Sequence, residues 1–371
     1  MDNPFASGLL WRLPEAPRKI ALLRASRIGD FLCAIPAFRA LRRALPDAEI
    51  AMITLPMLRD LALRLPHFDR VIEFPGFPGI AEKFFDARRT TLFFQEMQEE
   101  HFDLAIQMQG SGVNSNPFAL LLGAKATAGF VREGDPAGRL AAALPYPRNV
   151  HEVRCVLALT SFLGAPEQGE ELEFPLWRAD HDEAAALVQG AEPPLIGLHA
   201  AARDATRRWS LERFAEAARE LRRRYGGTLI ILGEPEEMAS GAELEQQVGA
   251  PSLNLVGKTT LVTLGAVIAR LSLLITNDTG PAHIAYALRT PTVTIFGAGN
   301  PATNGPLQDG PYRVLAHPVP CRPCGYTLCP IGYPCLDGVT VPQVMAAAQE
   351  IIKQIPPYSK KSQVVPYKDK C

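Results

Sequence analysis

Short apolar runs alternate with helical patterns along the chain. Residues 19–24 form an apolar run that is typical of a buried strand. Apolar side chains then recur at helical spacing over residues 31–45, where Pro36 is expected to kink the helix or to mark its first turns. Strand patterns return at residues 50–54 and 103–107. Because strands separated by helices pair in parallel, this half of the chain predicts an α/β domain.

A second series of strands and helices follows a proline-containing stretch near residues 173–194. The expected elements are strands 195–199, 228–233, 253–256, 273–277 and 292–296, and helices 211–225, 236–248, 261–271 and 281–288. We therefore predict an α/β protein with two Rossmann-like domains whose parallel sheets face a cleft. The N-terminal domain is expected at residues 1–180, the C-terminal domain at 181–355, and a frayed polar tail at 356–371.

Composition narrows the class of protein. The 371 residues carry 38 Lys and Arg against 39 Asp and Glu, a formal net charge of −1, which excludes an overtly basic nucleic-acid binder and an acidic disordered tail. The length exceeds the roughly 250–300 residues that one core supports, in keeping with two domains. The sequence contains no uncharged apolar stretch of about 18 residues, so we expect no transmembrane helix. The first 13 residues lack the pattern of an export signal, so we expect a cytoplasmic protein.

Residues 277–283 (Asn-Asp-Thr-Gly-Pro-Ala-His), at the end of an expected strand, form the most informative segment. The free backbone N–H groups of Thr279 and Gly280 would point out of a helix start, where the helix dipole favours an anion such as a phosphate. Gly280 would let that phosphate approach the backbone closely. Asp278 would repel phosphate, so we expect it to accept hydrogen bonds from backbone amides or ligand hydroxyls. The alternative is a well-capped turn that binds no ligand.

Residues 24–30 join the first strand to the first helix. Ligands of doubly wound sheets bind at the carboxyl ends of strands, which is where this loop falls. Gly29 permits a tight turn, and Asp30 would stand at the head of the helix. There Asp30 would either cap the helix by accepting a hydrogen bond from a backbone amide of the first turn, or act as a general base on an acceptor hydroxyl.

Two further loops at expected strand ends carry charge. Arg207 and Arg208 follow the first strand of the second half and would neutralise a diphosphate, unless they belong to a solvated loop. Glu234 and Glu236 follow the next strand and would accept hydrogen bonds from ribose hydroxyls, or else complement a helix N-terminus.

Four of the seven cysteines lie close together in a proline-rich stretch, namely Cys321, Cys324, Cys329 and Cys335. Such a group would bind zinc or an iron–sulfur cluster. The first pair has the spacing of a zinc knuckle, but the second half lacks a matching close pair, so free thiols in a reducing cytosol are the alternative. No other pattern of histidines or carboxylates suggests a catalytic metal, and we expect no cofactor.

Four segments, in the same order along the chain, resemble glycosyltransferase family 9, the ADP-heptose:lipopolysaccharide heptosyltransferase family. They are residues 27–30 with the helix that carries Pro36, residues 102–110, residues 207–210 and residues 277–283. The resemblance extends from about residue 19 to residue 352, and the cysteine-bearing loop is similar to one found in many members. It implies a GT-B fold and an inverting, metal-independent sugar transfer. The acceptor would bind on the N-terminal side and the nucleotide sugar on the C-terminal side.

The resemblance also implies roles for single residues. Asp30 would be the general base that removes the acceptor hydroxyl proton. The leaving diphosphate would be stabilised by the helix start at Thr279 and Gly280 and by a cation, Arg207 or Arg208; many members carry lysine where Arg207 stands. The remaining implied contacts are Asp278 and His283 with the donor, Glu234 or Glu236 with its ribose, and Arg27, Gly29 and Gln109 on the acceptor side.

The substrates that the resemblance implies are defaults: ADP-heptose as donor, and the lipopolysaccharide core or a related, lipid-linked glycan as acceptor. Such an acceptor implies peripheral contact with the inner membrane face. Arg39, Arg42 and Arg43 would meet anionic lipid or glycan phosphates there, unless they form a solvated helix face. Two other functions fit the same sequence: a nucleotide-sugar epimerase or hydrolase of GT-B fold, and a non-catalytic glycan- or metal-binding protein. No nucleic-acid partner is expected.

Overall fold

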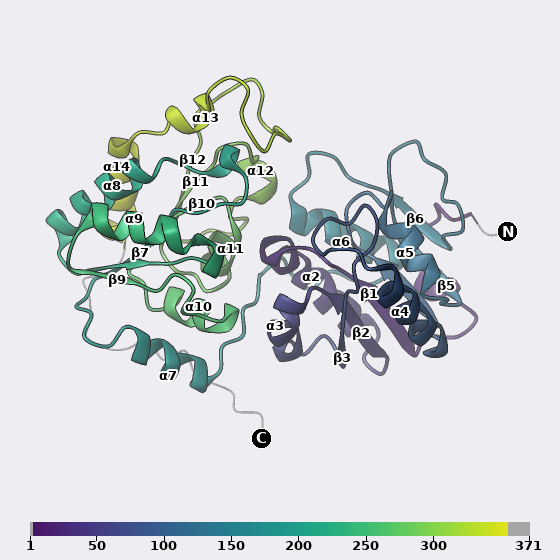
Figure 1. Ribbon diagram of the computed structural model, residues 1–371. Coiled ribbons are helices and arrows are strands. Elements are labelled where there is room, and N and C mark those ends of the chain that lie inside the picture. The colour runs from purple at the N-terminus through teal and green to yellow at the C-terminus, as the bar shows by residue number, and fades with distance from the viewer. Residues whose placement is uncertain (1–2, 355–371) are drawn as a thin grey trace.

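The computed structural model describes residues 3–354 and has two lobes, each built around a six-stranded parallel sheet (Figure 1). Neighbouring strands pair in parallel throughout both sheets. The predicted α/β class with two parallel sheets is therefore confirmed. The polar tail expected at residues 356–371 lies outside the described residues.

The strands of the N-terminal lobe are β1 (Lys19–Leu23), β2 (Glu49–Thr54), β3 (Arg70–Glu73), β4 (Leu104–Gln107), β5 (Ala126–Val131) and β6 (Ala142–Pro145). Its helices are α1 (Leu9–Arg12), α2 (Ile28–Ala44), α3 (Arg59–Arg64), α4 (Ala87–Glu99), α5 (Ser115–Leu121) and α6 (Glu152–Leu163), with a 3-10 turn η1 (Pro56–Leu58).

The strands of the C-terminal lobe are β7 (Leu195–His199), β8 (Thr228–Ile231), β9 (Ser252–Asn254), β10 (Leu273–Asn277), β11 (Thr292–Ile295) and β12 (Tyr312–Leu315). Its longer helices are α7 (Arg178–Leu187), α8 (Leu211–Tyr225), α9 (Met238–Val248), α10 (Leu261–Ile268), α11 (Gly280–Ala287) and α14 (Val341–Gln354). The short elements are α12 (Pro301–Asn304), α13 (Pro334–Asp337), η2 (Ala205–Arg207) and η3 (Pro235–Glu237).

The strand order places a switch point at the centre of each sheet. The first sheet runs β3-β2-β1-β4-β5-β6 and the second β12-β11-β10-β7-β8-β9. The order reverses between β1 and β4, and again between β7 and β10. In open α/β sheets ligands bind outside the carboxyl ends of strands at such points. The loops after β1, β4, β7 and β10 are therefore the places to look for a site.

The central strands are short apolar runs because helices cover both faces of their sheets. All residues of β7 and β10 are buried, as are four of the five residues of β1. On one side of the first sheet α2 runs unbroken for 17 residues with Pro36 inside it, beyond its second turn. One of the two expectations for Pro36, that it marks the first turns of the helix, is therefore wrong.

A packed seam joins the two lobes. Helices α2 and α11 lie against each other at the centre of the molecule (Figure 1). One apolar core continues from the N-terminal lobe, including Phe31 of α2, into the C-terminal lobe at Ile284 of α11. At one side of the seam, Nε2 of His151 lies 2.9 Å from the main-chain oxygen of Gly305. The starts of the two helices therefore hold a defined position relative to each other.

The segment between the sheets is tied to the N-terminal lobe by ion pairs. Arg64 of α3 pairs with Asp180, and both side chains are buried. Arg39 of α2 pairs with Glu173 of the same segment. Arg42 of α2 pairs with Asp69, within the N-terminal lobe itself. Arg39 and Arg42 are thus engaged within the protein and do not form a free basic face for lipid, whereas Arg43 is exposed.

A domain boundary after residue 180 remains our proposal. It falls within α7, which packs against α10 of the C-terminal lobe. None of the helices between residues 3 and 354 combines the length and the apolar character needed to cross a membrane.

Candidate active site

The carboxyl ends of β1 and β10 meet across the seam. A side chain on Gly29, in the first turn of α2, would come within 2.7 Å of the His283 ring of α11. A side chain on Gly280, the first residue of α11, would collide with Ile28 of α2. The two glycines are therefore needed for close approach of the helix starts. The structure thus brings together residues 27–30 and residues 277–283.

Asp30 is the third residue of α2 and does not cap that helix. The N-cap residue is Arg27, and its side chain makes no capping hydrogen bond. The Asp30 side chain is exposed, yet it lies among charged groups from both lobes. Desolvation by the surrounding protein raises the pKa of Asp30, and this effect outweighs the opposing influence of the cations Arg24 and Arg207. The capping alternative for Asp30 is thus not what the structure contains.

Arg207 and Arg208, which the sequence does not separate, have different partners. Nη1 of Arg207 lies 3.1 Å from Oδ2 of Asp278, at the end of β10. Arg208 instead donates to the main-chain oxygen of Ala202 through Nη2, at 2.7 Å. Asp278 is only 2% exposed, and burial raises its pKa to about 6 despite Arg207. Arg207 is therefore the cation at the strand end beside Asp278.

The start of α11 offers two backbone donors. Thr279 is the N-cap residue of this helix and Gly280 its first residue. Among the hydrogen bonds of residues 3–354, the N–H groups of Thr279 and Gly280 donate to no protein acceptor. Pro281 follows and has no N–H of its own to satisfy. Such amides at a helix start are suited to an anion.

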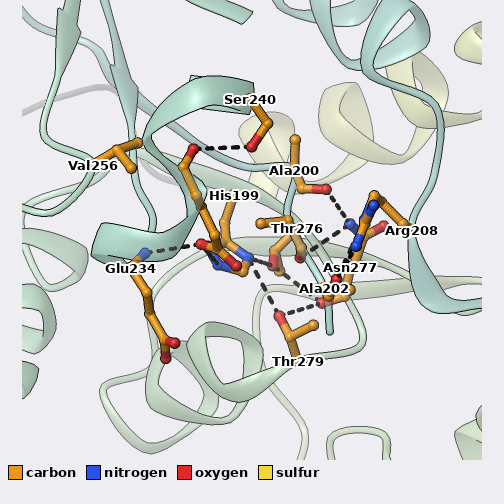
Figure 2. A network of polar contacts seen from close by, with 12 residues as sticks. His199, Ala200, Ala202, Arg208, Glu234, Ser240, Val256, Thr276, Asn277 and Thr279 are labelled. Atoms are coloured by element: carbon orange, nitrogen blue, oxygen red, sulfur yellow. Dashed lines mark hydrogen bonds and ion pairs between the residues drawn. The ribbon is translucent and has the colours of Figure 1, made fainter. Parts of the chain in front are cut away.

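Behind Thr279 lies a polar network that includes His199 at the end of β7 (Figure 2). Nδ1 of His199 is 3.3 Å from the hydroxyl oxygens of both Thr276 and Thr279. Nε2 of His199 is 3.8 Å from Oε2 of Glu237. Burial lowers the pKa of His199 to about 4, so the imidazole is neutral at pH 7. A neutral ring can accept from Thr279 on one nitrogen and donate toward Glu237 on the other.

Glu237 was not among the acidic residues that the sequence singled out. It lies in η3, and Oε2 of its carboxylate accepts a hydrogen bond of 2.8 Å from the backbone N–H of Glu234. Glu234 and Glu236 are exposed, whereas Glu237 is half-buried and faces the His199 network. The only signal in the sequence was its place in the same acidic run. The structure singles it out because a 3-10 turn directs its carboxylate inward.

His283 lies within the seam. Its Nδ1 is 3.7 Å from Sγ of Cys33, and its ring packs on Gly29. Burial lowers the pKa of His283 to about 4, so it too is neutral at pH 7. His283 is thus a packing residue of the helix interface in this structure, and its contact with a donor stays a prediction.

Three polar residues surround the turn after β1: Arg27, Gln109 and Ser26. Arg27 is exposed, and Nε2 of Gln109 donates to the main-chain oxygen of Ala25 at 3.1 Å. Oε1 of Gln109 and Oγ of Ser26 are buried, and within the described residues neither has a hydrogen-bond partner. Buried polar atoms without partners call for an explanation, such as a ligand or an ordered water. Ser26 was missed at the sequence level, where its only signal is a small hydroxyl in the same loop as Asp30.

A groove of about 570 Å³ opens on the N-terminal lobe near the end of β3. Its lining combines apolar side chains, such as Leu92 and Phe93, with charges of both signs: the cations Arg88 and Arg89 and the carboxylates Glu73, Asp86 and Glu96. The loop between β3 and α4 carries Phe84, which is 89% exposed, and Glu82, whose charge raises the pKa of Asp30. This loop therefore lies near Asp30.

The cysteine-bearing loop does not form a recognisable metal site. Cys321 is exposed, Cys324 and Cys329 are half-buried, and Cys335 is buried. Over residues 3–354 no three His, Cys, Asp or Glu side chains are grouped so that they could hold a metal ion. The loop braces the C-terminal site instead: the Thr206 hydroxyl donates to the main-chain oxygen of Tyr326 at 2.6 Å, next to Arg207.

Comparisons with known proteins identify the family of this chain. The family model of glycosyltransferase family 9 (heptosyltransferase) matches residues 90–333. The lipopolysaccharide core heptosyltransferase OpsX of Haemophilus influenzae is 22% identical over 310 residues, covering 81% of this chain and 84% of that protein.

Solved structures have the same two-lobed fold. The family 9 glycosyltransferase of Veillonella parvula superposes with a TM-score of 0.77 at 21% identity, covering 91% of this chain and 98% of that one. The E. coli heptosyltransferase WaaC with ADP gives a TM-score of 0.66 at 19% identity, covering 90% and 99%. The predicted GT-B fold is confirmed. The chain belongs to glycosyltransferase family 9 and is a sugar-transferring enzyme.

Proposed function

We propose that this enzyme transfers a heptose from ADP-heptose to the lipopolysaccharide core or a related glycan, with inversion and without a metal. One observation carries the proposal: Asp30 of the N-terminal lobe faces the Arg207–Asp278 pair of the C-terminal lobe across the seam. The residue proposed as proton acceptor thus belongs to one lobe and the proposed anion site to the other, and the helix starts that carry them pack against each other. The names of two similar proteins support the substrates, since OpsX is a lipopolysaccharide core heptosyltransferase and WaaC was solved with ADP.

The proposed reaction is a single displacement. The Asp30 carboxylate takes the proton of the acceptor hydroxyl while that oxygen forms a bond to the anomeric carbon. The bond between the anomeric carbon and the diphosphate oxygen breaks, and the electron pair leaves with the diphosphate. Attack from the side opposite the leaving group inverts the anomeric centre.

The leaving diphosphate is stabilised by groups of the C-terminal lobe. The amides of Thr279 and Gly280 donate to its oxygens, and Arg207 supplies positive charge. In the free enzyme Arg207 pairs with Asp278, so the diphosphate competes with that carboxylate for the guanidinium. An arginine in this position neutralises negative charge on the leaving diphosphate, a role that a divalent cation would otherwise fill.

We propose Glu237, in place of Glu234 or Glu236, as the partner of the donor ribose. Its carboxylate is half-buried at the end of β8, the position where acidic residues of dinucleotide-binding folds accept from ribose hydroxyls. His199 links Glu237 to Thr279 and so connects the ribose and diphosphate positions.

On the acceptor side we propose Gln109 and Ser26, whose buried oxygens have no protein partner among residues 3–354, as contacts for acceptor hydroxyls. Arg27, which is exposed, would meet the more distant, anionic parts of a glycan. Gly29 contributes by keeping the α2 start close to α11. A lipid-linked acceptor would bring the enzyme into peripheral contact with the inner membrane face.

The test replaces Asp30 with asparagine, which keeps the shape and removes the base. We expect turnover of ADP-heptose with acceptor to fall by about 10²–10⁴-fold while donor binding is retained. Asp47→Asn, at an exposed site after α2, is the matched control and should leave turnover unchanged. A fall of less than about tenfold in Asp30→Asn would reject the base assignment.

Two further measurements test the reaction class. Release of ADP should depend on the acceptor, and equal release without it would favour a hydrolase or epimerase. Turnover should persist in the presence of a chelator. A loss on chelation that magnesium restores would contradict metal independence.

A further inference from the structure

A buried ion pair stands directly behind Asp30. Arg24 follows β1 and is 3% exposed, and Glu152 is the first residue of α6. Nη2 of Arg24 donates to Oε1 of Glu152 at 2.7 Å. The two residues are 128 positions apart in the chain, so only the fold brings them together.

The same guanidinium holds the turn that carries Asp30. Nη2 of Arg24 also donates to the main-chain oxygen of Asp30 at 2.8 Å, and Nη1 donates to the main-chain oxygen of Met108 just after β4. One side chain therefore links the ends of β1 and β4, the first turn of α2 and the head of α6. Removing it would free the first turn of α2, and with it the Asp30 side chain.

Stability alone does not explain this pair. Burying two opposite charges costs desolvation that the mutual attraction only partly returns, and apolar residues of similar volume often do as well. Nε of Arg24 is also buried with no hydrogen-bond partner in the described part of the chain. An unsatisfied buried donor adds a further cost. The buried Arg24–Glu152 pair is therefore better explained by its effect on the neighbouring Asp30 than by its contribution to stability.

The charges that face Asp30 come from five elements. Arg24 and Glu152 lie behind it, Glu82 lies on the loop before α4, and Arg207 and Asp278 face it from the second lobe. The two other titratable neighbours are uncharged at pH 7. Burial raises the pKa of the Cys33 thiol, and it lowers that of His283 to about 4.

These groups act on the carboxyl in opposite directions. Arg24 and Arg207 lower the pKa of Asp30, whereas Glu152 and Glu82 raise it. Arg24 is the largest of the charged influences, ahead of Glu152. Yet the hydrogen bond from Arg24 to Asp30 goes to the main-chain oxygen of Asp30, and the same Nη2 also donates to the Glu152 carboxylate.

We propose that Arg24 and Glu152 are positioning residues that orient Asp30 and set its affinity for a proton. Arg24 fixes the first turn of α2 and opposes the rise in the pKa of the Asp30 carboxyl that desolvation causes. Glu152 holds the guanidinium away from the Asp30 carboxylate, which stays free to take a proton from the acceptor. This inference rests on the proposed role of Asp30 as base.

The experiment measures kcat and KM for ADP-heptose against pH in Arg24→Gln and Glu152→Gln. In Arg24→Gln we expect the acidic limb of the kcat profile to move up by roughly one pH unit, because a favourable charge is lost. In Glu152→Gln it should move down, because the guanidinium is no longer neutralised. At neutral pH kcat should fall by about tenfold or more in Arg24→Gln, with KM changing by less than about threefold.

The opposite directions separate positioning from a structural role. Arg24→Lys keeps the charge but loses the forked geometry, so its acidic limb should stay near that of the wild type while kcat remains reduced. Arg64→Gln breaks another buried pair, Arg64–Asp180, whose charges are not among those named as acting on Asp30, and it should lower the melting temperature without moving the limb. Limbs that stay in place, or that move the same way in both Arg24→Gln and Glu152→Gln, would overturn the proposal.

Two outcomes need a second readout. If Arg24→Gln fails to fold, Glu152→Gln decides alone, and a limb that does not move down overturns the inference. The activity of Asp30→Asn separates this inference from the proposed function. If that variant keeps more than about a tenth of the turnover, the base assignment itself is wrong. If it is inactive but the limbs do not move, only the role of Arg24 and Glu152 is rejected.

Discussion

The two lobes use the same local structure for opposite charges. In each, a buried central strand ends in a turn whose following helix begins with a glycine-containing segment at the seam: β1 leads to Gly29, and β10 leads to Gly280. In the N-terminal lobe the carboxylate of Asp30 is exposed and the cation Arg24 is buried behind it. A carboxylate presented in this way is suited to accept a proton.

In the C-terminal lobe the order is reversed. The carboxylate of Asp278 is buried, the cation Arg207 lies partly exposed in front of it, and two backbone amides open at the helix start. This arrangement is suited to accept an anion. The comparison teaches that one strand–turn–helix unit can serve either chemistry, depending on which charge is buried and which is presented.

The largest effect on donor binding is expected from removing the presented cation. Arg207→Gln should weaken binding of ADP-heptose by roughly 10- to 100-fold, since a hydrogen bond to a charged group contributes about 1.5–3 kcal/mol. Isothermal titration calorimetry measures this. Arg208→Gln is the matched control, because Arg208 bonds to Ala202 and not to Asp278. Equal losses in the two variants would remove the distinction between them.

A second effect concerns the close approach of the two helix starts. Gly29→Ala would push a methyl group against the His283 ring, and we expect a loss of about 1–3 kcal/mol in the free energy of unfolding. Denaturant unfolding and turnover should both be measured. Gly325→Ala is the control, since no atom lies within 4 Å of the added carbon. An unaltered stability in Gly29→Ala would mean that the seam is loosely packed.

The third effect is a pH dependence of donor binding. Burial raises the pKa of Asp278 to about 6, so its carboxyl gains a negative charge as the pH rises through that value. Since the diphosphate of ADP-heptose has no group that titrates near pH 6, affinity for it should decrease from pH 5 to pH 7. Asp278→Asn should bind with an affinity that is flat over this range. A slope that persists in the variant would assign the effect to another group.

The same group affects stability in a defined direction. The folded protein holds the Asp278 proton up to about pH 6, whereas the unfolded chain releases it near pH 4. Between these values the folded state binds more protons, so the contribution of Asp278 to the free energy of unfolding is present at low pH and is lost as the pH rises. Comparing melting temperatures of the wild type and Asp278→Asn at pH 4 and pH 7 isolates it.

The smallest effect is expected at the ribose position. Glu237→Gln should weaken donor binding only severalfold, because the glutamine amide oxygen can still accept from the ribose hydroxyl and a hydrogen bond between uncharged groups retains about 0.5–1.5 kcal/mol. Glu236→Gln, at an exposed residue of the same turn, should leave the affinity unchanged. A loss of affinity in Glu236→Gln without one in Glu237→Gln would favour Glu236, one of the two ribose partners that the sequence suggested.

Much of the fold was predictable because it depends on local patterns. The strands at Leu195–His199 and Leu273–Asn277 and the helix at Leu211–Tyr225 have the bounds that the sequence predicts. Fully buried strands and an amphipathic helix leave a periodic signal. Strands such as β3 and β12, by contrast, have mostly half-buried residues and were not anticipated.

The candidate site was predictable in its segments but not in its contacts. Residue order identified the turns of Asp30 and Asp278, because ligands bind at the carboxyl ends of central strands. It did not identify Arg24 or Glu237, and it left Arg207 and Arg208 as alternatives. Neighbours in a loop share composition and charge, and only backbone geometry decides which side chain points inward.

The sequence by itself determined the succession of strands and helices, the family and the short polar segments that carry the chemistry. The tertiary structure decided which charges are buried, which are exposed, and which residues of one lobe face which residues of the other. The reason is physical: the pairs that define the site, such as Arg24 with Glu152 and Cys33 with His283, are 128 and 250 residues apart. Their contact is a product of packing between elements, which no local pattern encodes.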